Sequence, residues 1–193
     1  MAHFHFRLAT AADAPRLRDL IESAFRAADT RADWTGDLSL GARFHVQLDD
    51  MLARIANPDG AFLVATTTTT TTTTEPQDGV QKDEAEEVVA CVNIFKKQLP
   101  DRDAVARLAL LAVDHRYQQG GLGRRVMVEA EKLCREMWRV RRAGLNALDT
   151  RVALIRWYER CGYVRTGEVT AISLPPDELR LVEFEKELAV GVV

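Results

Sequence analysis

Cysteine is scarce in this chain: its 193 residues contain three copies, Cys91, Cys134 and Cys161. Their number is odd and no two of them form a CxxC pair, so the sequence predicts neither a disulfide framework nor a cysteine-based zinc site. Histidine is also scarce, with four copies, and the two near the N-terminus do not make a full ligand set. We therefore expect no bound metal, and thiols that are buried or half-buried in a reducing compartment.

Long apolar runs and a strong excess of one charge are absent as well. The longest apolar run, 108–113, is far shorter than the roughly 20 residues that a membrane helix needs, and no apolar signal segment follows Met1. The chain has 26 Lys and Arg against 29 Asp and Glu, which disfavours a nucleic-acid partner. We expect one domain over residues 1–193, cytoplasmic or nuclear, with no membrane or nucleic-acid partner, as a monomer or homodimer.

One low-complexity segment interrupts an otherwise ordinary composition. Nine threonines, 66–74, run into a polar, acidic stretch that ends at Glu87. Such a composition buries little apolar surface to offset the entropy lost on ordering. We therefore expect a flexible Thr-rich and acidic loop at about 67–87 between two strands, although threonine suits strands and its first copies can extend the preceding one. An interaction module working through this loop is one functional alternative.

Apolar periodicity predicts the elements around this loop, because side chains in strands alternate and those on a helix face repeat every three to four residues. The run 105–113 is almost entirely apolar, as is typical of a central strand. The expected order is strand 4–8, helices 11–28 and 44–55, strands 61–65, 88–95 and 105–113, a helix from 122 to Gly144, strand 145–148, helix 151–161, and strands 163–169 and 181–188. This order predicts an α/β protein of the α+β type and disfavours a doubly wound sheet.

The segment after the strand 105–113 is the most informative for function. The strand runs through a turn containing glycines into a long amphipathic helix, with Arg124 and Arg125 in its first turn. The first N–H groups of a helix lack intrahelical partners and the helix dipole favours negative charge there, so this arrangement predicts an anion site. Two other interpretations stay open: a turn that only starts a helix, and a dinucleotide fingerprint, although Val126 stands where that fingerprint needs its third glycine.

Two motifs in this half of the chain resemble those of one enzyme family. Gln118-x-x-Gly121-x-Gly123 resembles the Gln/Arg-x-x-Gly-x-Gly/Ala motif of the GNAT superfamily of acetyl-CoA-dependent N-acetyltransferases. Residues 157–163, Trp-Tyr-Glu-Arg-Cys-Gly-Tyr, are similar to the family's Leu-Tyr-Glu-Lys-x-Gly-Phe signature. The resemblance extends over most of the chain and implies the GNAT acyl-CoA N-acyltransferase fold: a central mixed, largely antiparallel twisted sheet of about six or seven strands flanked by about four helices.

The resemblance also implies where acetyl-CoA, the acyl donor, binds. Backbone N–H groups of residues 118–124 would hold its pyrophosphate, and the end of the strand 105–113 would pair with its pantetheine arm. A bulge there would separate this strand from the next one and open a cleft, in which a strand N–H can polarise the thioester carbonyl. The expected cofactor-binding residues are Leu111, Ala112, Val113, Gln118, Gln119, Gly120, Gly121, Leu122, Gly123 and Arg124.

Tyr158, in the second motif, is the expected catalytic residue. By the resemblance it would act as the general acid that protonates the departing thiolate when an amine attacks the thioester. The alternative is an aromatic side chain that only packs on an amphipathic helix. The expected reaction is transfer of an acetyl group to a primary amine by direct attack in a ternary complex, the acceptor being a small molecule or a protein amino group.

Two positions depart from the family's pattern. Arg107 stands where some members carry a glutamate general base, and Arg151 stands where many carry an asparagine, with Asn146 nearby. An amine of pKa about 10 arrives protonated at neutral pH, so a group or a water chain must remove a proton. These departures keep open a non-catalytic acyl-CoA-binding or sensing module of the same fold.

The acceptor site is expected between the first two helices. Trp34 beside Asp37 offers a ring and a carboxylate that suit a cationic amine, although such a tryptophan can equally pin a loop to the domain. Asp37 and Glu168 are the candidate carboxylates for the missing base. The sequence names no particular amine.

Overall fold

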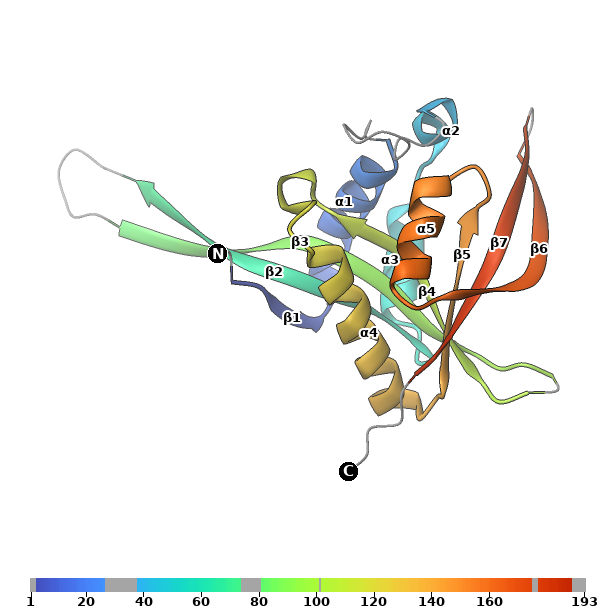
Figure 1. Ribbon diagram of the computed structural model, residues 1–193. Coiled ribbons are helices and arrows are strands. Elements are labelled where there is room, and N and C mark those ends of the chain that lie inside the picture. Colours follow the sequence, from blue (N-terminus) through green and yellow to red (C-terminus); the bar gives the residue numbers. More distant parts are fainter. Residues whose placement is uncertain (1–2, 27–37, 74–80, 101, 175–176, 189–193) are drawn as a thin grey trace.

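The computed structural model describes residues 3–26, 38–73, 81–100, 102–174 and 177–188. The chain forms a seven-stranded sheet flanked by helices (Figure 1). The elements are β1 (His5–Leu8), η1 (Ala11–Asp13), α1 (Ala14–Arg26), α2 (Leu38–Arg43), α3 (Leu48–Ile55), β2 (Gly60–Thr73), β3 (Gln81–Lys97), β4 (Val105–Val113), η2 (His115–Tyr117), α4 (Leu122–Trp138), β5 (Arg142–Leu148), α5 (Val152–Arg160), β6 (Val164–Leu174) and β7 (Asp177–Glu187). The predicted order of elements and the α+β class are confirmed, with α2 as an additional short helix.

The strand order in the sheet is β1-β2-β3-β4-β5-β7-β6. Neighbouring strands are antiparallel except for β4 and β5, which are parallel and joined by the crossover helix α4. Helices α1 and α3 cover one face of the sheet, while α4 and α5 cover the other (Figure 1). None of the helices described is both long enough and apolar enough to cross a membrane.

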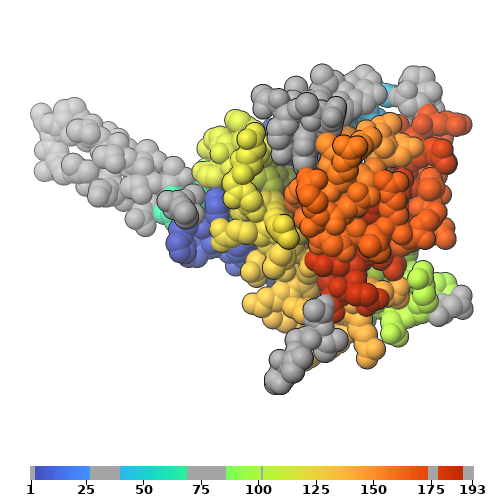
Figure 2. Space-filling view, viewed as in Figure 1, coloured from blue at the N-terminus to red at the C-terminus, as the bar shows by residue number. Residues whose placement is uncertain are grey.

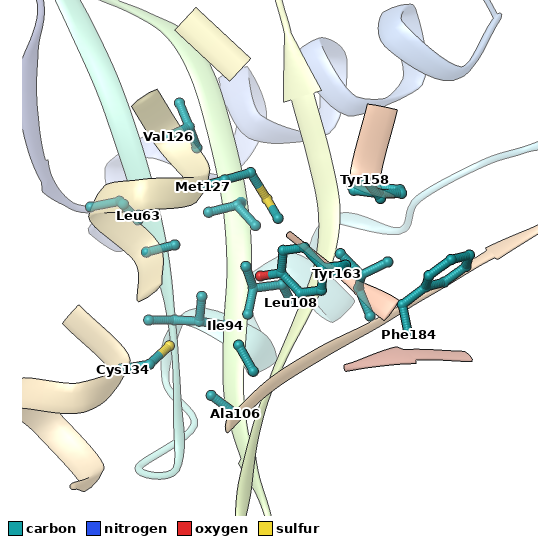
Figure 3. Packing of buried hydrophobic residues seen from close by; sticks show 14 of the residues in the cluster. Leu63, Ile94, Ala106, Leu108, Val126, Met127, Cys134, Tyr158, Tyr163 and Phe184 are labelled. Atoms are coloured by element: carbon teal, nitrogen blue, oxygen red, sulfur yellow. The ribbon is translucent and has the colours of Figure 1, made fainter. Parts of the chain in front are cut away.

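Two apolar clusters fill the space between these layers. On one face, Val126 and Met127 of α4 pack on Leu63, Ile94 and Leu108 of the central strands (Figure 3). The other cluster joins α1 and α3 to the opposite face of β2, β3 and β4. Because β4 is buried on both faces, its near-continuous apolar sequence is explained.

The helix expected to end at Gly144 ends earlier. Arg139, with φ of 54°, caps α4 in the left-handed conformation, and Gly144 lies inside β5. The glycine leaves room for the Arg107 side chain, whose Nη1 would lie 2.5 Å from a Cβ atom at this position. A glycine near the end of a periodic run therefore misled the sequence prediction.

The prediction of a flexible loop at 67–87 is wrong for residues 67–73 and 81–87, which the structure describes. Strands β2 and β3 continue as an antiparallel ladder from Thr67 opposite Glu87 to Thr73 opposite Gln81. The resulting hairpin extends away from the body of the molecule (Figure 1). Two causes outweigh the polar composition: threonine is β-branched, and each added pair continues a register already fixed in the core.

Strand β4 separates from β5 in the middle of the sheet. The two strands pair at only two positions, Ala106 with Ala143 and Arg107 with Gly144. Farther along β4, the register against β3 shifts, and Leu110 adopts a left-handed φ of 52°. This irregularity is the bulge that the family resemblance implied. Because a bulge bends its strand, the sheet opens between β4 and β5.

Candidate active site

A cavity of about 440 Å³ lies where β4 and β5 diverge. It is bounded by β4, by the turn that starts α4, by β5 and by α5, and the start of α4 borders α5 at the surface (Figure 2). All of the expected cofactor-binding residues except Gly120 line this cavity, and so does Tyr158. Trp34 and Asp37 lie outside the described residues. The structure thus gathers nearly all of the expected site residues that it describes around one opening.

The cavity reaches both faces of the sheet. Leu145 and Ala147 of β5 belong to the apolar cluster under α4 and α5, whereas Asn146 and Leu148 alternate with them and point the opposite way. Phe25 of α1 lines the cavity on that opposite side. Two molecules can therefore approach the gap from the two faces of the sheet.

The turn before α4 has the backbone geometry of an anion site. Gln119 and Gly121 both have positive φ, 66° and 78°, and Gly121 is the residue before the first turn of α4. A Cβ atom at Gly121 would meet nothing within 4 Å, so the backbone faces open space there. The side chain of Gln118 donates a hydrogen bond to the carbonyl of Val113, at 3.1 Å, which ties the turn to the end of β4.

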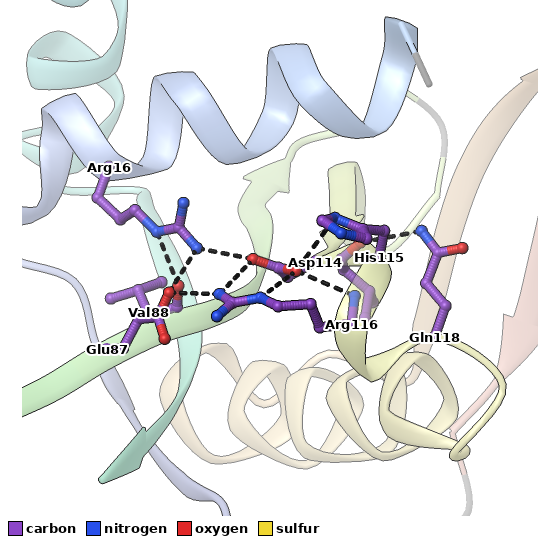
Figure 4. Close-up of polar contacts among 8 residues, drawn as sticks. Arg16, Glu87, Val88, Asp114, His115, Arg116 and Gln118 are labelled. Carbon is purple, nitrogen blue, oxygen red and sulfur yellow. Dashed lines mark hydrogen bonds and ion pairs between the residues drawn. The ribbon is translucent and has the colours of Figure 1, made fainter. Parts of the chain in front are cut away.

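Asp114 anchors the beginning of the same turn. Its carboxylate is 8% exposed and accepts hydrogen bonds from the backbone N–H of Arg116 at 3.1 Å and from the guanidinium of Arg16, on α1, at 2.9 Å (Figure 4). Hydrogen bonds from Arg116 and Arg16 hold the pKa of Asp114 well below its usual range, against the opposing effect of burial. Glu87 of β3 completes the network through both arginines. This network was not predicted from the sequence, in which the only signal is a single acidic residue directly after a buried strand.

Tyr158 lies on α5 with its ring largely buried. Its ring centroid is 6.2 Å from that of Tyr163 and 6.4 Å from that of Phe184 (Figure 3). Burial raises the pKa of Tyr158 to about 12, with the positive charge of Arg151 acting in the opposite direction. No residue in the described ranges forms a hydrogen bond with its hydroxyl. Tyr158 is thus a neutral phenol on the cavity wall, and its hydroxyl has no hydrogen-bond acceptor among the residues described.

A second polar cluster lies where β4 and β5 still pair, and this pairing closes one end of the gap in which the cavity lies. The guanidinium of Arg107, on β4, donates hydrogen bonds to Asn146 on β5 and to Glu183 on β7. Arg107 is 7% exposed, so its charge is compensated inside the protein. Glu168, a candidate base, is exposed on β6 and does not line the cavity. Glu183 was not predicted as part of the site, because the alternation of polar residues in 177–187 resembles that of a solvent-facing strand.

Comparison with known proteins agrees with this geometry. The family model described as Acetyltransferase (GNAT) family matches residues 46–163, which contain the bulged strand, the turn before α4 and all of α5. No curated protein matches the chain.

Solved structures of acetyltransferases share the fold. The GNAT-family acetyltransferase from Streptococcus pneumoniae is 16% identical, with a TM-score of 0.63, over 97% of this chain and 100% of that one. Arabidopsis thaliana NAA60 in complex with a bisubstrate analogue is 12% identical, with a TM-score of 0.69 and the same coverage. A spermidine N-acetyltransferase chimera from Vibrio cholerae and hSSAT is 11% identical, with a TM-score of 0.62, over 96% of this chain and 95% of that one. At these identities the likeness is one of fold.

Proposed function

This chain belongs to the GNAT acetyltransferase family, and on that premise we propose that it transfers an acetyl group from acetyl-CoA to a primary amine. The observation that carries the proposal is the cavity between β4 and β5, which is bordered by a glycine turn at one end and by Tyr158 on its wall. The acceptor is a small-molecule amine or a protein amino group.

The residues around the turn fit the phosphates of acetyl-CoA. Gly121 presents backbone to open space at the start of α4, where unpaired N–H groups and the helix dipole favour an anion. Arg124 adds a positive side chain on the same cavity wall. Leu111, Ala112 and Val113 would hold the pantetheine arm, since β4 past its bulge has no partner strand on the β5 side. When bound, acetyl-CoA supplies the activated acetyl group.

In the proposed reaction, Tyr158 stabilises the leaving sulfur. The amine nitrogen bonds to the acetyl carbon, the carbon–sulfur bond breaks, and the phenol donates a hydrogen bond to the sulfur as negative charge develops. A phenol with a pKa of about 12 remains protonated at neutral pH. It is a weaker acid than a thiol of pKa about 8.5, so its main contribution is this hydrogen bond, and the proton lost by the amine completes the thiol.

The amine would approach from the α1 face, opposite the helices α4 and α5. The cavity opens there beside Phe25 and Asn146. Trp34 and Asp37 remain proposed acceptor contacts, since both belong to the segment that joins α1 to α2. Water leading out of the gap can take the proton of the incoming ammonium, because no carboxylate lines the cavity among the described residues.

Calorimetric titration with acetyl-CoA and CoA tests the donor site. Replacing Gly121 by valine forces a β-branched residue into φ of 78° and should weaken binding by about tenfold or more. Gly120→Ala is the matched control: a Cβ there would lie 3.8 Å from the nearest atom outside its chain neighbours, and Gly120 does not line the cavity. Equal binding by wild type and Gly121→Val would overturn the assignment of the turn.

A non-catalytic acyl-CoA-binding module is the second candidate. The observation in its favour is Arg107, which occupies the position of a family base and is already hydrogen-bonded to Asn146 and Glu183. Thiol release measured over a panel of primary amines separates the two functions. Acetyl-CoA binding without thiol release for any amine would support the module.

A further inference from the structure

Arg107 lies where the pairing between β4 and β5 ends. It belongs to the last residue pair between β4 and β5, opposite Gly144, after which the two strands separate. Its guanidinium reaches past β5, donating one hydrogen bond to Asn146 on that strand and another to Glu183 on β7. One side chain therefore ties three strands together at the closed end of the cavity.

The absence of a side chain at Gly144 makes room for the guanidinium of Arg107. A Cβ atom at Gly144 would lie 2.5 Å from Nη1 of Arg107 and 3.1 Å from the backbone carbonyl oxygen of Phe184. The first distance is a clash, so the guanidinium can lie across β5 only because this position lacks a side chain. Arg107 and Gly144 thus form one unit in which either substitution disturbs the same contact.

We propose that Arg107 is a positioning residue that sets the separation of β4 and β5 at the closed end of the cavity, and thereby limits the size of the acyl group that the enzyme accepts. This inference rests on the proposed function. A pantetheine arm that runs along β4 from the turn before α4 points its acyl group toward Arg107.

The lining of the closed end explains why strand separation matters there. Leu108 and Leu145 directly follow the last residue pair between β4 and β5, belong to the same apolar cluster, and both line the cavity. Asn146, which Arg107 holds, lines it from the next position of β5. If Arg107 releases β5, the space between these side chains widens and a longer acyl chain fits.

The test measures binding of three donors by calorimetry: CoA, acetyl-CoA and butyryl-CoA. In Arg107→Met and in Gly144→Ala, the preference for acetyl-CoA over butyryl-CoA should fall by about tenfold, the scale set by methylene groups in an apolar pocket. The affinity for CoA, which has no acyl group, should stay close to that of wild type. Arg107→Lys keeps the charge without the two-sided guanidinium and should fall between wild type and Arg107→Met.

Arg142 and Glu185 provide a matched control. They form an ion pair of 2.9 Å between β5 and β7, with both side chains 15% exposed. Arg142 also donates a hydrogen bond to the carbonyl of Asp103, before β4 begins, and neither residue of the pair lines the cavity. Arg142→Met therefore removes a comparable ion pair and should leave donor preference unchanged. Hydrogen exchange of the β5 amides at 144–148 gives a readout that needs no donor: exchange should be faster in Arg107→Met and Gly144→Ala than in Arg142→Met.

The possible outcomes separate the two proposals. An unchanged acetyl-to-butyryl preference in both Arg107→Met and Gly144→Ala overturns the role in acyl size. If the amides at 144–148 exchange no faster in Arg107→Met and Gly144→Ala than in Arg142→Met, Arg107 does not hold β4 and β5 together. A wild-type protein that binds none of the three donors overturns the proposed function and the acyl-size role with it, while the exchange comparison still decides whether Arg107 holds the strands.

Discussion

Strands β2 and β3 pair along their whole length apart from one bulge, whereas β4 and β5 pair at two positions only. The sequences suggest the opposite: the outer part of the β2–β3 hairpin is polar and repetitive, while β4 is almost continuously apolar. The difference teaches that hydrophobicity places a strand in the core without deciding how far it pairs. Pairing follows connection and register, because a hairpin extends an existing ladder and a crossover does not.

The gap between β4 and β5 is also where the chemistry is concentrated. Backbone groups that a neighbouring strand would have used remain available to a ligand along β4. The long hairpin, in contrast, uses its backbone groups between its own two strands. Changes to Tyr158, Leu110, Asp13 and the outer hairpin probe this contrast, from the largest expected effect to the smallest, and Glu87→Gln is the counterpart of the hairpin change.

Tyr158→Phe should have the largest effect. Loss of the phenolic donor should lower kcat by about a hundredfold, the lower end of the effect of removing one hydrogen-bond donor to a developing charge. The affinity for CoA should change little, since the aromatic ring still fills its place beside Tyr163 and Phe184. The measurement is steady-state thiol release together with calorimetry of CoA.

The pH dependence gives Tyr158 a second check. Because burial raises its pKa to about 12, the phenol keeps its proton through neutral and moderately alkaline pH. Ionisation of Tyr158 should therefore not lower the wild-type rate below about pH 10. In this range the rates of wild type and Tyr158→Phe should depend on pH in the same way. A decline near pH 8 that disappears in the variant would contradict the buried, neutral phenol.

Leu110→Val should reduce the separation between β4 and β5. Leu110 has a left-handed φ of 52°, which a β-branched residue tolerates poorly. Valine should therefore favour a straighter β4 that stays nearer to β5, and the affinity for acetyl-CoA should fall about tenfold. Leu110→Gly, which adopts the same φ without strain, is the control and should keep that affinity. Equal affinities in the two variants would mean that the bulge does not hold the gap open.

Asp13→Asn tests the ion pair between Asp13 and Arg7, next to the inner part of the β2–β3 hairpin. Arg7 donates two hydrogen bonds of 2.9 Å to Asp13 and also contacts Glu86 of β3. The hydrogen bonds from Arg7 lower the pKa of Asp13 to about 2, whereas an unfolded aspartate titrates near 3.9. The carboxylate therefore stabilises the fold fully above about pH 5, and this contribution is lost as the pH falls toward 2.

Urea denaturation measures this contribution. Because the Arg7 side chain is 34% exposed, solvent screens the pair, and we expect Asp13→Asn to lower the free energy of unfolding by about 1 kcal/mol at pH 7. The difference between wild type and variant should shrink as the pH is lowered from 5 to 3. A difference that stays constant over this range would show that the ion pair is not its source.

Shortening the hairpin should have the smallest effect. Thr68 pairs with Glu86, so an Asn-Gly turn can replace residues 69–85 and close the ladder with a two-residue loop. Thermal stability and acetyl-CoA affinity should remain close to those of the full chain, because the shortened ladder keeps the ion pairs of Glu86 and Glu87. Loss of acetyl-CoA binding would give the hairpin a role in the site that its distance from the cavity does not suggest.

Glu87→Gln in the full chain is the informative counterpart. Glu87 pairs with Arg16 and Arg116, the two arginines that hold Asp114 at the start of the glycine turn. A weakened network should lower acetyl-CoA affinity by a few fold, roughly the scale of a partly exposed ion pair. The base of the hairpin should therefore matter more to the site than its outer part.

The sequence by itself determined the order of the elements, the glycine turn and the helix that carries Tyr158. Each of these depends on residues within a few positions of one another, where periodicity and turn chemistry act directly. The same local signals misplaced the end of α4 at Gly144, because that glycine serves a contact with Arg107, 37 positions earlier in the chain.

The tertiary structure alone decided how those pieces meet. Asp114 is held by Arg16, 98 positions away, and Arg107 is held by Glu183, 76 positions away. Neither partner is marked by its neighbours in sequence, since a charged residue on a strand or helix looks solvent-exposed until another element covers it. The width of the gap is likewise a property of the assembled sheet, because β4 pairs with β5 at only two positions and its register against β3 shifts near Leu110.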